Sequence, residues 1–246
     1  IVKDEWTIKQ DESIIEFNED KLLKMTKTII KEMETNLNKV RPLSIDGTKG
    51  NGIYHSKEEM HNNYLLRFDK SNCLFVLGEK SDNKNSFEEL LSNGGARYVL
   101  TNESNLYLFE GQGDITHASH GLRKIVIVAG MFYKSNNGNL LDCMSGHYRT
   151  PVEDLIYLTI FLIKTFEEAI ADIDDQNRLL KVEAFFKKIW FKGLDSGSDD
   201  SYEITAEQEL YMEILNAVFQ KNLNELTDKK QKEIKKCSQN NGYSIV

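Results

Sequence analysis

The histidines are the first residues whose type and spacing could carry chemistry, because the chain has only five of them. Three fall close together: His117, His120 and His147. His117 and His120 have an HxxH spacing, which on a helix would place both rings on one face for a metal ion. Glycines at 111, 113 and 121 indicate a loop or a strand end instead, and no third ligand completes a pattern. A structural role is favoured, and no metal site is predicted.

The segment Ser145-Gly-His-Tyr-Arg149 is the strongest candidate for a binding site. It runs directly into Thr150-Pro-Val-Glu153, the pattern of a helix start with Thr as N-cap and Pro at the first helical position. Free backbone N–H groups and the helix dipole favour an anion at such a place. His147 and Arg149 would add donors, and a guanidinium suits phosphate. We predict a phosphorylated small molecule or nucleotide as the ligand.

A structural interpretation of the same segment stays open. Gly146 would then form a turn, Tyr148 would pack on the helix, and Arg149 would pair with a surface acid. Arg97 follows Gly94-Gly95 at the start of a strand and is a second candidate for an anion contact, unless it serves only the turn. The predicted ligand-binding residues are Arg97, His120, Ser145, His147, Tyr148 and Arg149.

Cys143 lies four residues before His147 and suggests a thiol–imidazole pair. On a strand the two side chains would be about 13 Å apart, so contact requires a turn between them. His117 or His120 is an equally good partner. The candidates for catalysis are therefore Cys143, His117 and His147, while a buried and inert cysteine is the commoner case.

The stretch 178–192 differs from the rest of an acidic chain because it is basic and ends in Trp190 and Phe191. Basic amphipathic helices of this kind bind calmodulin or anionic membrane surfaces. In the alternative, the core takes up Phe185, Phe186, Ile189 and Trp190, and the lysines face water.

The two prolines, Pro42 and Pro151, divide the chain of 246 residues into three predicted parts. Residues 1–46 form an N-terminal helical segment, with apolar residues at helical spacing from Ile14 to Leu37. Residues 47–150 form a β-rich domain with a hairpin at 136–138 and a short helix before Gly94. Residues 151–246 form a C-terminal helical bundle packed on it.

Three helices are expected in that bundle. The first follows Thr150, the second spans about 178–192, and Thr205 and Gln208 cap the third. The tail from Thr227 is expected to fray. The predicted fold is therefore α+β, with a central antiparallel sheet or small barrel between the two helical parts. Its predicted strands are 52–55, 73–78, 97–100, 105–109, 124–129, 131–134 and 140–144.

Composition excludes several classes of protein. A net charge of −8 is the wrong sign for a general nucleic-acid binder. Three cysteines without CxxC spacing predict neither a disulfide framework nor a zinc site, and indicate a soluble protein of a reducing compartment. No apolar run is long enough to span a membrane. The chain opens at Ile1 without an initiator Met or a signal peptide, and is interpreted as a piece of something longer.

Four short motifs resemble known families: Gly94-Gly-Ala-Arg-Tyr-Val-Leu100, Ile115-Thr-His-Ala-Ser119, Ala129-Gly130 and the 145–149 segment. Their order resembles domains of proteins that intracellular bacteria of the Legionella type secrete into host cells. It is also similar to plant IQ-motif calmodulin-binding proteins. One extra residue, Thr150, separates Arg149 from Pro151, and no IQ motif is present, so calmodulin binding does not transfer.

The resemblance implies a host-directed effector domain that is secreted into the host cell. It supplies no reaction, and any cofactor stays unknown. Three hypotheses follow. The first is a module that binds a phosphorylated small molecule at the 145–150 junction. The second is an enzyme that modifies a host protein with Cys143, His117, His120 or His147. The third is a docking module that offers the 178–192 helix to a host partner such as calmodulin.

Overall fold

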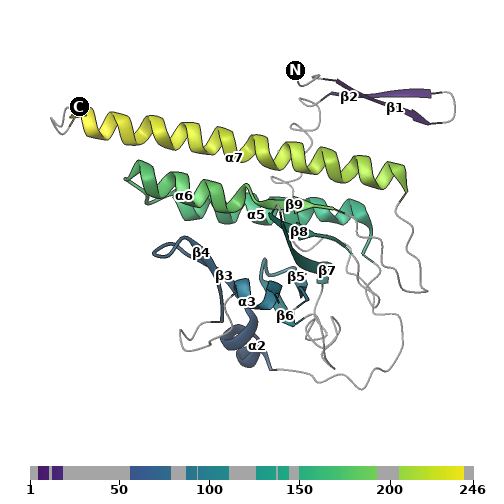
Figure 1. Cartoon of the computed structure of the whole chain (residues 1–246), viewed down its shortest axis with the longest axis horizontal. Helices are drawn as coiled ribbons and strands as arrows, with labels where there is room; N and C mark the ends of the chain where they lie inside the picture. The colour runs from purple at the N-terminus through teal and green to yellow at the C-terminus, as the bar shows by residue number, and fades with distance from the viewer. Residues whose placement is uncertain are drawn as a thin grey trace. The chain divides into compact units, whose positions relative to one another are not determined.

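The structure, a computed structural model, describes residues 5–10, 13–18, 56–78, 87–92, 94–110, 126–136, 138–143, 150–192 and 205–240. The chain divides into two compact units, Ile1–Val40 and Arg41–Val246. The described part of the first unit is a β-hairpin, and every other described element belongs to the second (Figure 1).

The hairpin of the first unit corrects part of the predicted N-terminal helix. β1 (Glu5–Gln10) pairs antiparallel with β2 (Ser13–Asn18), so that Trp6 lies opposite Phe17 and Ile8 opposite Ile15. The helix predicted from Ile14 is therefore wrong as far as Asn18. β-branched and aromatic residues favour strands, and a short apolar run does not by itself distinguish a strand from a helix. The remainder of that prediction, 19–37, lies outside the described residues.

The second unit is an α+β fold with a central sheet, as predicted. Its elements in chain order are α2 (Lys57–Tyr64), β3 (Leu66–Asp69), β4 (Leu74–Leu77), α3 (Phe87–Ser92), β5 (Ala96–Thr101), β6 (Leu106–Glu110), β7 (Val126–Ser135), β8 (Gly138–Leu141), the 3-10 helix η2 (Val152–Asp154), α5 (Leu155–Ile170), α6 (Gln176–Phe186), β9 (Ile189–Phe191) and α7 (Ala206–Asn240).

The central sheet has the strand order β6-β5-β7-β8-β9. The first four strands pair antiparallel, and the hairpin predicted at 136–138 is present, with Ser135 opposite Gly138. The two strands predicted on either side of Gly130 are one continuous strand, β7. A glycine inside a strand often marks a close backbone approach rather than a break, and Gly130 has such a neighbour in Asp142. β3 and β4 form a separate hairpin.

β9 corrects the helix predicted over 178–192. α6 begins at Gln176 and ends at Phe186, and Ile189–Phe191 then pairs parallel with β8, with Leu140 opposite Trp190. The backbone N–H of Asn139 also bonds the carbonyl of Lys188 at 2.7 Å. Ile, Trp and Phe favour strands, and the open edge of β8 supplies the partner. The sheet is therefore mixed rather than antiparallel, and its last strand comes from the C-terminal part of the chain.

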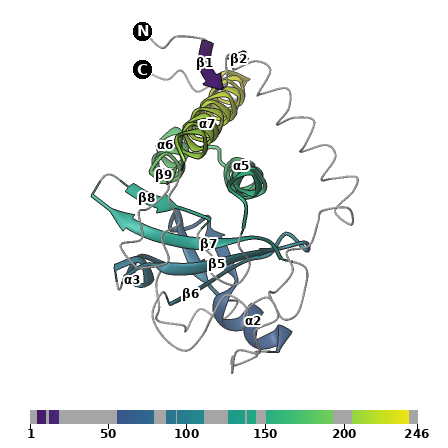
Figure 2. The ribbon, with the colours of Figure 1, turned by 90° about the vertical axis from the view of Figure 1, so that its right-hand side faces the viewer.

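Three helices cover one face of the sheet, and Figure 2 shows α5, α6 and α7 together on that side with α2 on the other. The buried residues of α5 recur every three or four positions, among them Leu155, Leu158, Leu162 and Phe166. They join Tyr98, Val128 and Phe132 of the sheet in one core. On the opposite face, Met60 of α2 packs on Tyr107 and Phe109 of β6. Successive strand residues therefore serve two different cores.

α7 begins where predicted and ends later than expected. The backbone N–H of Gln208 donates to Thr205 Oγ1 at 3.2 Å, and the N–H of Thr205 donates to Gln208 Oε1 at 3.1 Å, which confirms the predicted cap. The tail that was expected to fray from Thr227 continues as helix to Asn240. Thr227 is 2% exposed and Ile234 packs against the core, so this stretch still has contacts with the rest of the second unit.

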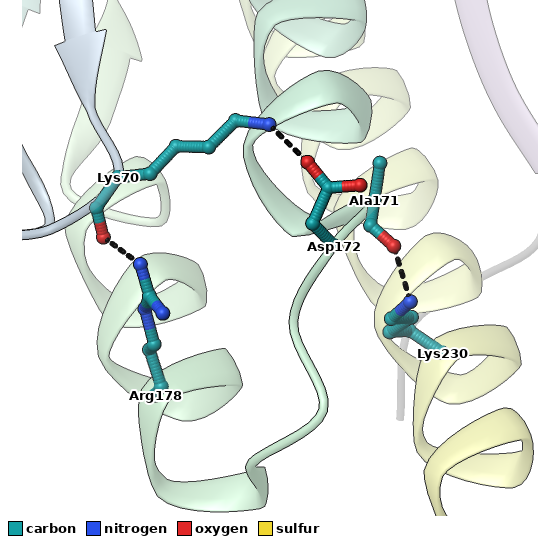
Figure 3. Close-up of polar contacts among 5 residues, drawn as sticks. All are labelled: Lys70, Ala171, Asp172, Arg178 and Lys230. Atoms are coloured by element: carbon teal, nitrogen blue, oxygen red, sulfur yellow. Dashed lines mark hydrogen bonds and ion pairs between the residues drawn. The ribbon is translucent and has the colours of Figure 1, made fainter.

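The β3–β4 turn is fixed to the turn between α5 and α6 through Lys70 (Figure 3). Lys70 Nζ lies 2.9 Å from Asp172 Oδ2, and the carbonyl of Lys70 accepts a hydrogen bond from Arg178 Nη2. Lys230 of α7 bonds the carbonyl of Ala171 in the same turn. Three parts of the chain that are far apart in sequence, at Lys70, at 171–178 and at Lys230, thus meet at one corner of the second unit.

Candidate functional site

Of the residues predicted to bind or react, the structure describes Arg97 and Cys143. The remaining ones, His117, His120, Ser145, His147, Tyr148 and Arg149, lie outside the described residues. Both neighbours of the segment 144–149, Cys143 and Thr150, are described. The structure therefore describes the residues on either side of this segment and their contacts.

Both ends of this segment attach to the same short stretch of β7. β8 pairs with β7 only as far as Leu141. Beyond it, the N–H of Met131 donates to Asp142 Oδ1 at 2.9 Å, and the N–H of Asp142 donates to the carbonyl of Met131 at 3.1 Å. Two residues away, the N–H of Ala129 donates to Thr150 Oγ1 at 3.2 Å. Asp142 and Thr150 thus bond the strand edge that β8 leaves open.

Tyr98 and Gly130 hold the first of these ends from the helix-covered side of the sheet. Tyr98 is fully buried, and its hydroxyl donates to the carbonyl of Asp142. A Cβ on Gly130 would lie 2.0 Å from that carbonyl oxygen and 2.8 Å from Tyr98 Oη. The close approach therefore requires glycine at 130.

Sequence reasoning missed the roles of Tyr98, Gly130 and Asp142, although signals for two of them exist. Tyr98 carries a polar group in a strand that is otherwise apolar toward the helices, and Gly130 interrupts an apolar strand. Two of the motifs behind the family resemblance, those at 94–100 and 129–130, contribute residues to this place.

Thr150 is not the helix cap that its sequence pattern predicts. Its hydroxyl accepts from the N–H of Ala129, and Thr150 is 4% exposed. Pro151 precedes η2 as its N-cap and supplies no side-chain hydrogen bond. Thr150 therefore attaches the chain to the sheet, because an unbonded N–H in a buried strand costs more than an exposed helix end, which water can solvate.

Arg97 lies on the other face of the sheet. Tyr98 points toward the helices, and adjacent strand residues point to opposite faces. Arg97 pairs in register with Met131. Its charge also acts on Tyr133: burial raises the pKa of this phenol to about 12, and Arg97 opposes the rise. Arg97 and the start of η2–α5 are thus on different sides of the sheet, and we leave Arg97 out of the site.

Cys143 does not have the properties of a nucleophile. Burial, together with the carboxylates of Asp142, Glu153 and Asp154, raises the pKa of its thiol to about 12. Catalytic cysteines need the opposite environment, with nearby positive charge that favours the thiolate. The structure therefore argues against Cys143 as a catalytic residue.

Among the described residues, carboxylates dominate the electrostatics at the start of η2–α5. Glu153 and Asp154 occupy the first turn, where a helix favours negative charge. Tyr211 of α7 donates to the carbonyl of Glu153 at 3.1 Å, and burial followed by these carboxylates raises the pKa of its phenol. The described groups that act on Cys143 and Tyr211 here are therefore acidic, and His147 and Arg149 of the segment 144–149 stay the candidates for positive charge.

The basic stretch 178–192 is not available as one amphipathic helix. Val182, Phe186 and Ile189 are buried in the core, and Phe185 packs against it. Trp190 is 40% exposed, but it belongs to β9 and not to α6. A calmodulin target presents its apolar face to the partner, whereas the apolar face of this stretch is buried in the core of the second unit.

Comparison of the chain with family models, curated proteins and solved structures gives no significant match. Among the described residues, no group of three or more His, Cys, Asp or Glu side chains is placed to hold a metal ion. No described helix is both long and apolar enough to cross a membrane.

Proposed function

We propose that the chain is a ligand-binding module that holds a phosphorylated small molecule beside the start of η2–α5, with Ser145, His147 and Arg149 as the donors. The observation that carries the proposal is the pair of anchors on β7. Asp142 and Thr150 bond positions 131 and 129, two residues apart, and six residues connect Cys143 to Thr150. Each proposed donor is at most three residues along the chain from Cys143 or Thr150.

The helix start supports the choice of an anion. η2 has no side-chain cap, so its first N–H groups keep the capacity to bond a ligand oxygen. The nearby carboxylates of Asp142, Glu153 and Asp154 repel a phosphate, however. Binding therefore depends on the donors Arg149 and His147, and their loss should abolish it rather than weaken it slightly.

The motif resemblance supports a setting for this activity. The secreted domains that share the motifs at 94–100 and 145–149 act inside host cells. We therefore propose a nucleotide or sugar phosphate of the host as the ligand, and the host cell as the place of action.

A thermal-shift screen of the chain against nucleotides, sugar phosphates and inorganic phosphate tests the proposal. A ligand at about 100 times its Kd adds about 2.7 kcal/mol of stability, which is a shift of about 5–11 °C for a chain of this size. The double variant His147→Gln/Arg149→Gln should lose the shift while it keeps the far-UV spectrum and the Tm of the free protein.

Two further variants serve as controls. Lys229→Gln/Lys232→Gln removes two exposed charges from α7, which is remote in sequence from the junction, and Arg97→Gln removes the cation on the other face of the sheet. Both should respond to the ligand as the wild type does. Retention of the shift in the His147/Arg149 variant would show that the site is misplaced, and the absence of a shift with every phosphate compound would refute the proposed function.

A further inference from the structure

A cavity of about 320 Å³ lies between the β3–β4 hairpin, the turn between β5 and β6, and the exposed side of α5. It is separate from the junction at Thr150, and no residue of the proposed phosphate site lines it. Pockets for small ligands begin at about 300 Å³, so this cavity suits a compact molecule with a single ring.

The floor of the cavity is apolar and rigid. Leu66, Phe75 and Leu106 are buried there, whereas Phe68 and Phe161 are half-buried and leave ring surface uncovered. Phe68 packs on Phe75, with ring centroids 5.7 Å apart, and on Phe186 at 5.3 Å. Such packing fixes the ring in position, so the wall is formed before a ligand arrives and favours a flat aromatic body.

The rim carries charges of both signs, on opposite walls. Lys70 comes from the hairpin, and Glu168 comes from α5. The Lys70 ammonium is paired with Asp172, but this pair is exposed, with 42% and 83% of the two side chains accessible. Exposed ion pairs contribute little to stability, so a ligand carboxylate can replace Asp172 at low cost.

The backbone around Lys70 keeps its side chain at the rim (Figure 3). Its carbonyl is held by Arg178 Nη2, and Cys73 Sγ also contacts that carbonyl at 3.8 Å. The other cation of this wall, Arg67, donates Nε and Nη2 to the carbonyl of Gly78 and so is already engaged at the end of β4. Lys70 and Glu168 therefore remain as the two groups that can recognise a charged ligand head.

We propose that this cavity binds a small zwitterion with an aromatic body, of the aromatic amino acid class. The ring covers Phe68 and Phe161, the carboxylate takes the Lys70 ammonium, and the ligand ammonium faces Glu168. Asn105, which lines the same rim, supplies a neutral hydrogen-bond partner. A head with only one charge leaves either Lys70 or Glu168 without its complement.

Three probes with the same ring and different heads test this recognition on the full chain: L-phenylalanine, 3-phenylpropionate and phenethylamine. By calorimetric titration, L-phenylalanine should bind at least about tenfold more tightly than either analogue, a difference of about 1.4 kcal/mol. Equal affinity of all three would refute recognition of the head, and no binding of any at millimolar concentration would refute the site.

Two substitutions test whether Lys70 recognises the ligand carboxylate and Glu168 the ligand ammonium. Lys70→Met should abolish the advantage of L-phenylalanine over phenethylamine, and Glu168→Gln should abolish its advantage over 3-phenylpropionate. Lys229→Met is the matched control and should change neither ratio. Because the ratios compare ligands on the same variant, a general loss of stability does not alter them. Thr165→Phe, which places a ring at the rim, should weaken all three probes, and unaltered binding would place the ligand elsewhere.

Discussion

At Gly130 the carbonyl oxygen of Asp142 lies where a side chain would begin, 2.0 Å from the position of a Cβ. That carbonyl is the acceptor for Tyr98, and Asp142 also bonds both backbone groups of Met131. We expect Gly130→Ala to push Asp142 out of this arrangement and to lower the free energy of unfolding by about 1–3 kcal/mol, as overpacked cores do. Urea unfolding followed by circular dichroism measures the loss.

A second variant separates the backbone contact from the hydroxyl. Tyr98→Phe removes only the hydrogen bond to Asp142 and should cost about 1–2 kcal/mol. In that background Gly130→Ala should still be destabilising, because the carbonyl of Asp142 is the nearer obstacle. A neutral effect of Gly130→Ala in either background would contradict the contact.

Reactivity at Cys143 tests the local electrostatics directly. With its pKa raised to about 12 by burial and carboxylates, about one thiol in ten thousand is ionised near pH 8. Iodoacetamide should label the exposed Cys237 first and Cys143 only after unfolding. Mass spectrometry of the labelled peptides gives both rates in one sample, and equal rates in the folded protein would restore Cys143 as a candidate for chemistry.

Among the elements, β9 depends on a side chain from α7. Asn216 Oδ1 accepts from the N–H of Phe191 at 2.8 Å, and its Nδ2 donates to the carbonyl of Phe191 at 2.8 Å. This amide takes the place of a further strand and occupies the outer edge of the sheet. Exposed edges invite pairing with other chains, so Asn216 fixes α7 to the sheet and also blocks this edge at Phe191.

Asn216→Ala should leave both backbone groups of Phe191 without their partner and cost about 1–3 kcal/mol. Amide exchange at Phe191 should become faster in the same variant. Asn222→Ala is the control, because Asn222 bonds only the carbonyl of Val218 within its own helix; its effect should stay within about 0.5 kcal/mol. Equal losses in the two variants would show that the contact with β9 is unimportant.

The same elements show what the sequence could and could not predict. β5, β6, α5 and the start of α7 follow from local patterns: β-rich runs, helical periodicity and the Thr205–Gln208 cap. β9 does not, because its strand character depends on β8, about fifty residues earlier in the chain, and non-local pairing leaves no local signal. The prediction of Thr150 as a helix cap is wrong for a related reason, because a residue suited to capping can instead bond a distant strand.

For the candidate site, the sequence indicates the segment 145–149, which lies outside the described residues, and gives no sign of the contacts at Asp142 and Thr150 on either side of it. Arg97 was grouped with His147 and Arg149 because all three can bind an anion, yet the period of two along β5 places Arg97 on the face away from α5. The register needed for this conclusion comes from pairing with β7. The cavity beside Lys70 likewise has no sequence signal, because its walls come from three separate parts of the chain.

For the whole molecule, the dependence of stability on pH follows from tyrosine phenols and a cysteine thiol whose pKa values burial raises. Burial raises the pKa of Tyr107 and of Tyr133 to about 12 and that of Cys143 to about 12, and it raises the pKa of Tyr98 as well. The ordinary pKa values are 10.0 for the phenols and 9.0 for the thiol. Both states therefore keep these protons below about pH 9. As the pH rises further, the unfolded chain loses the thiol proton from about pH 9 and the phenol protons from about pH 10, whereas the folded state retains them to about pH 12.

Because the unfolded chain alone loses these protons, the free energy of unfolding must fall as the pH rises through this window. Each proton retained only in the folded state lowers it by about 1.4 kcal/mol per pH unit. In urea unfolding, these groups should leave the free energy of unfolding unchanged up to about pH 9, and the free energy of unfolding should decline steeply from about pH 10 to 12. Tyr133→Phe and Cys143→Ala should each make the decline shallower, since each removes one titrating group. A stability that is unchanged between about pH 8 and 11 would contradict the burial of these groups.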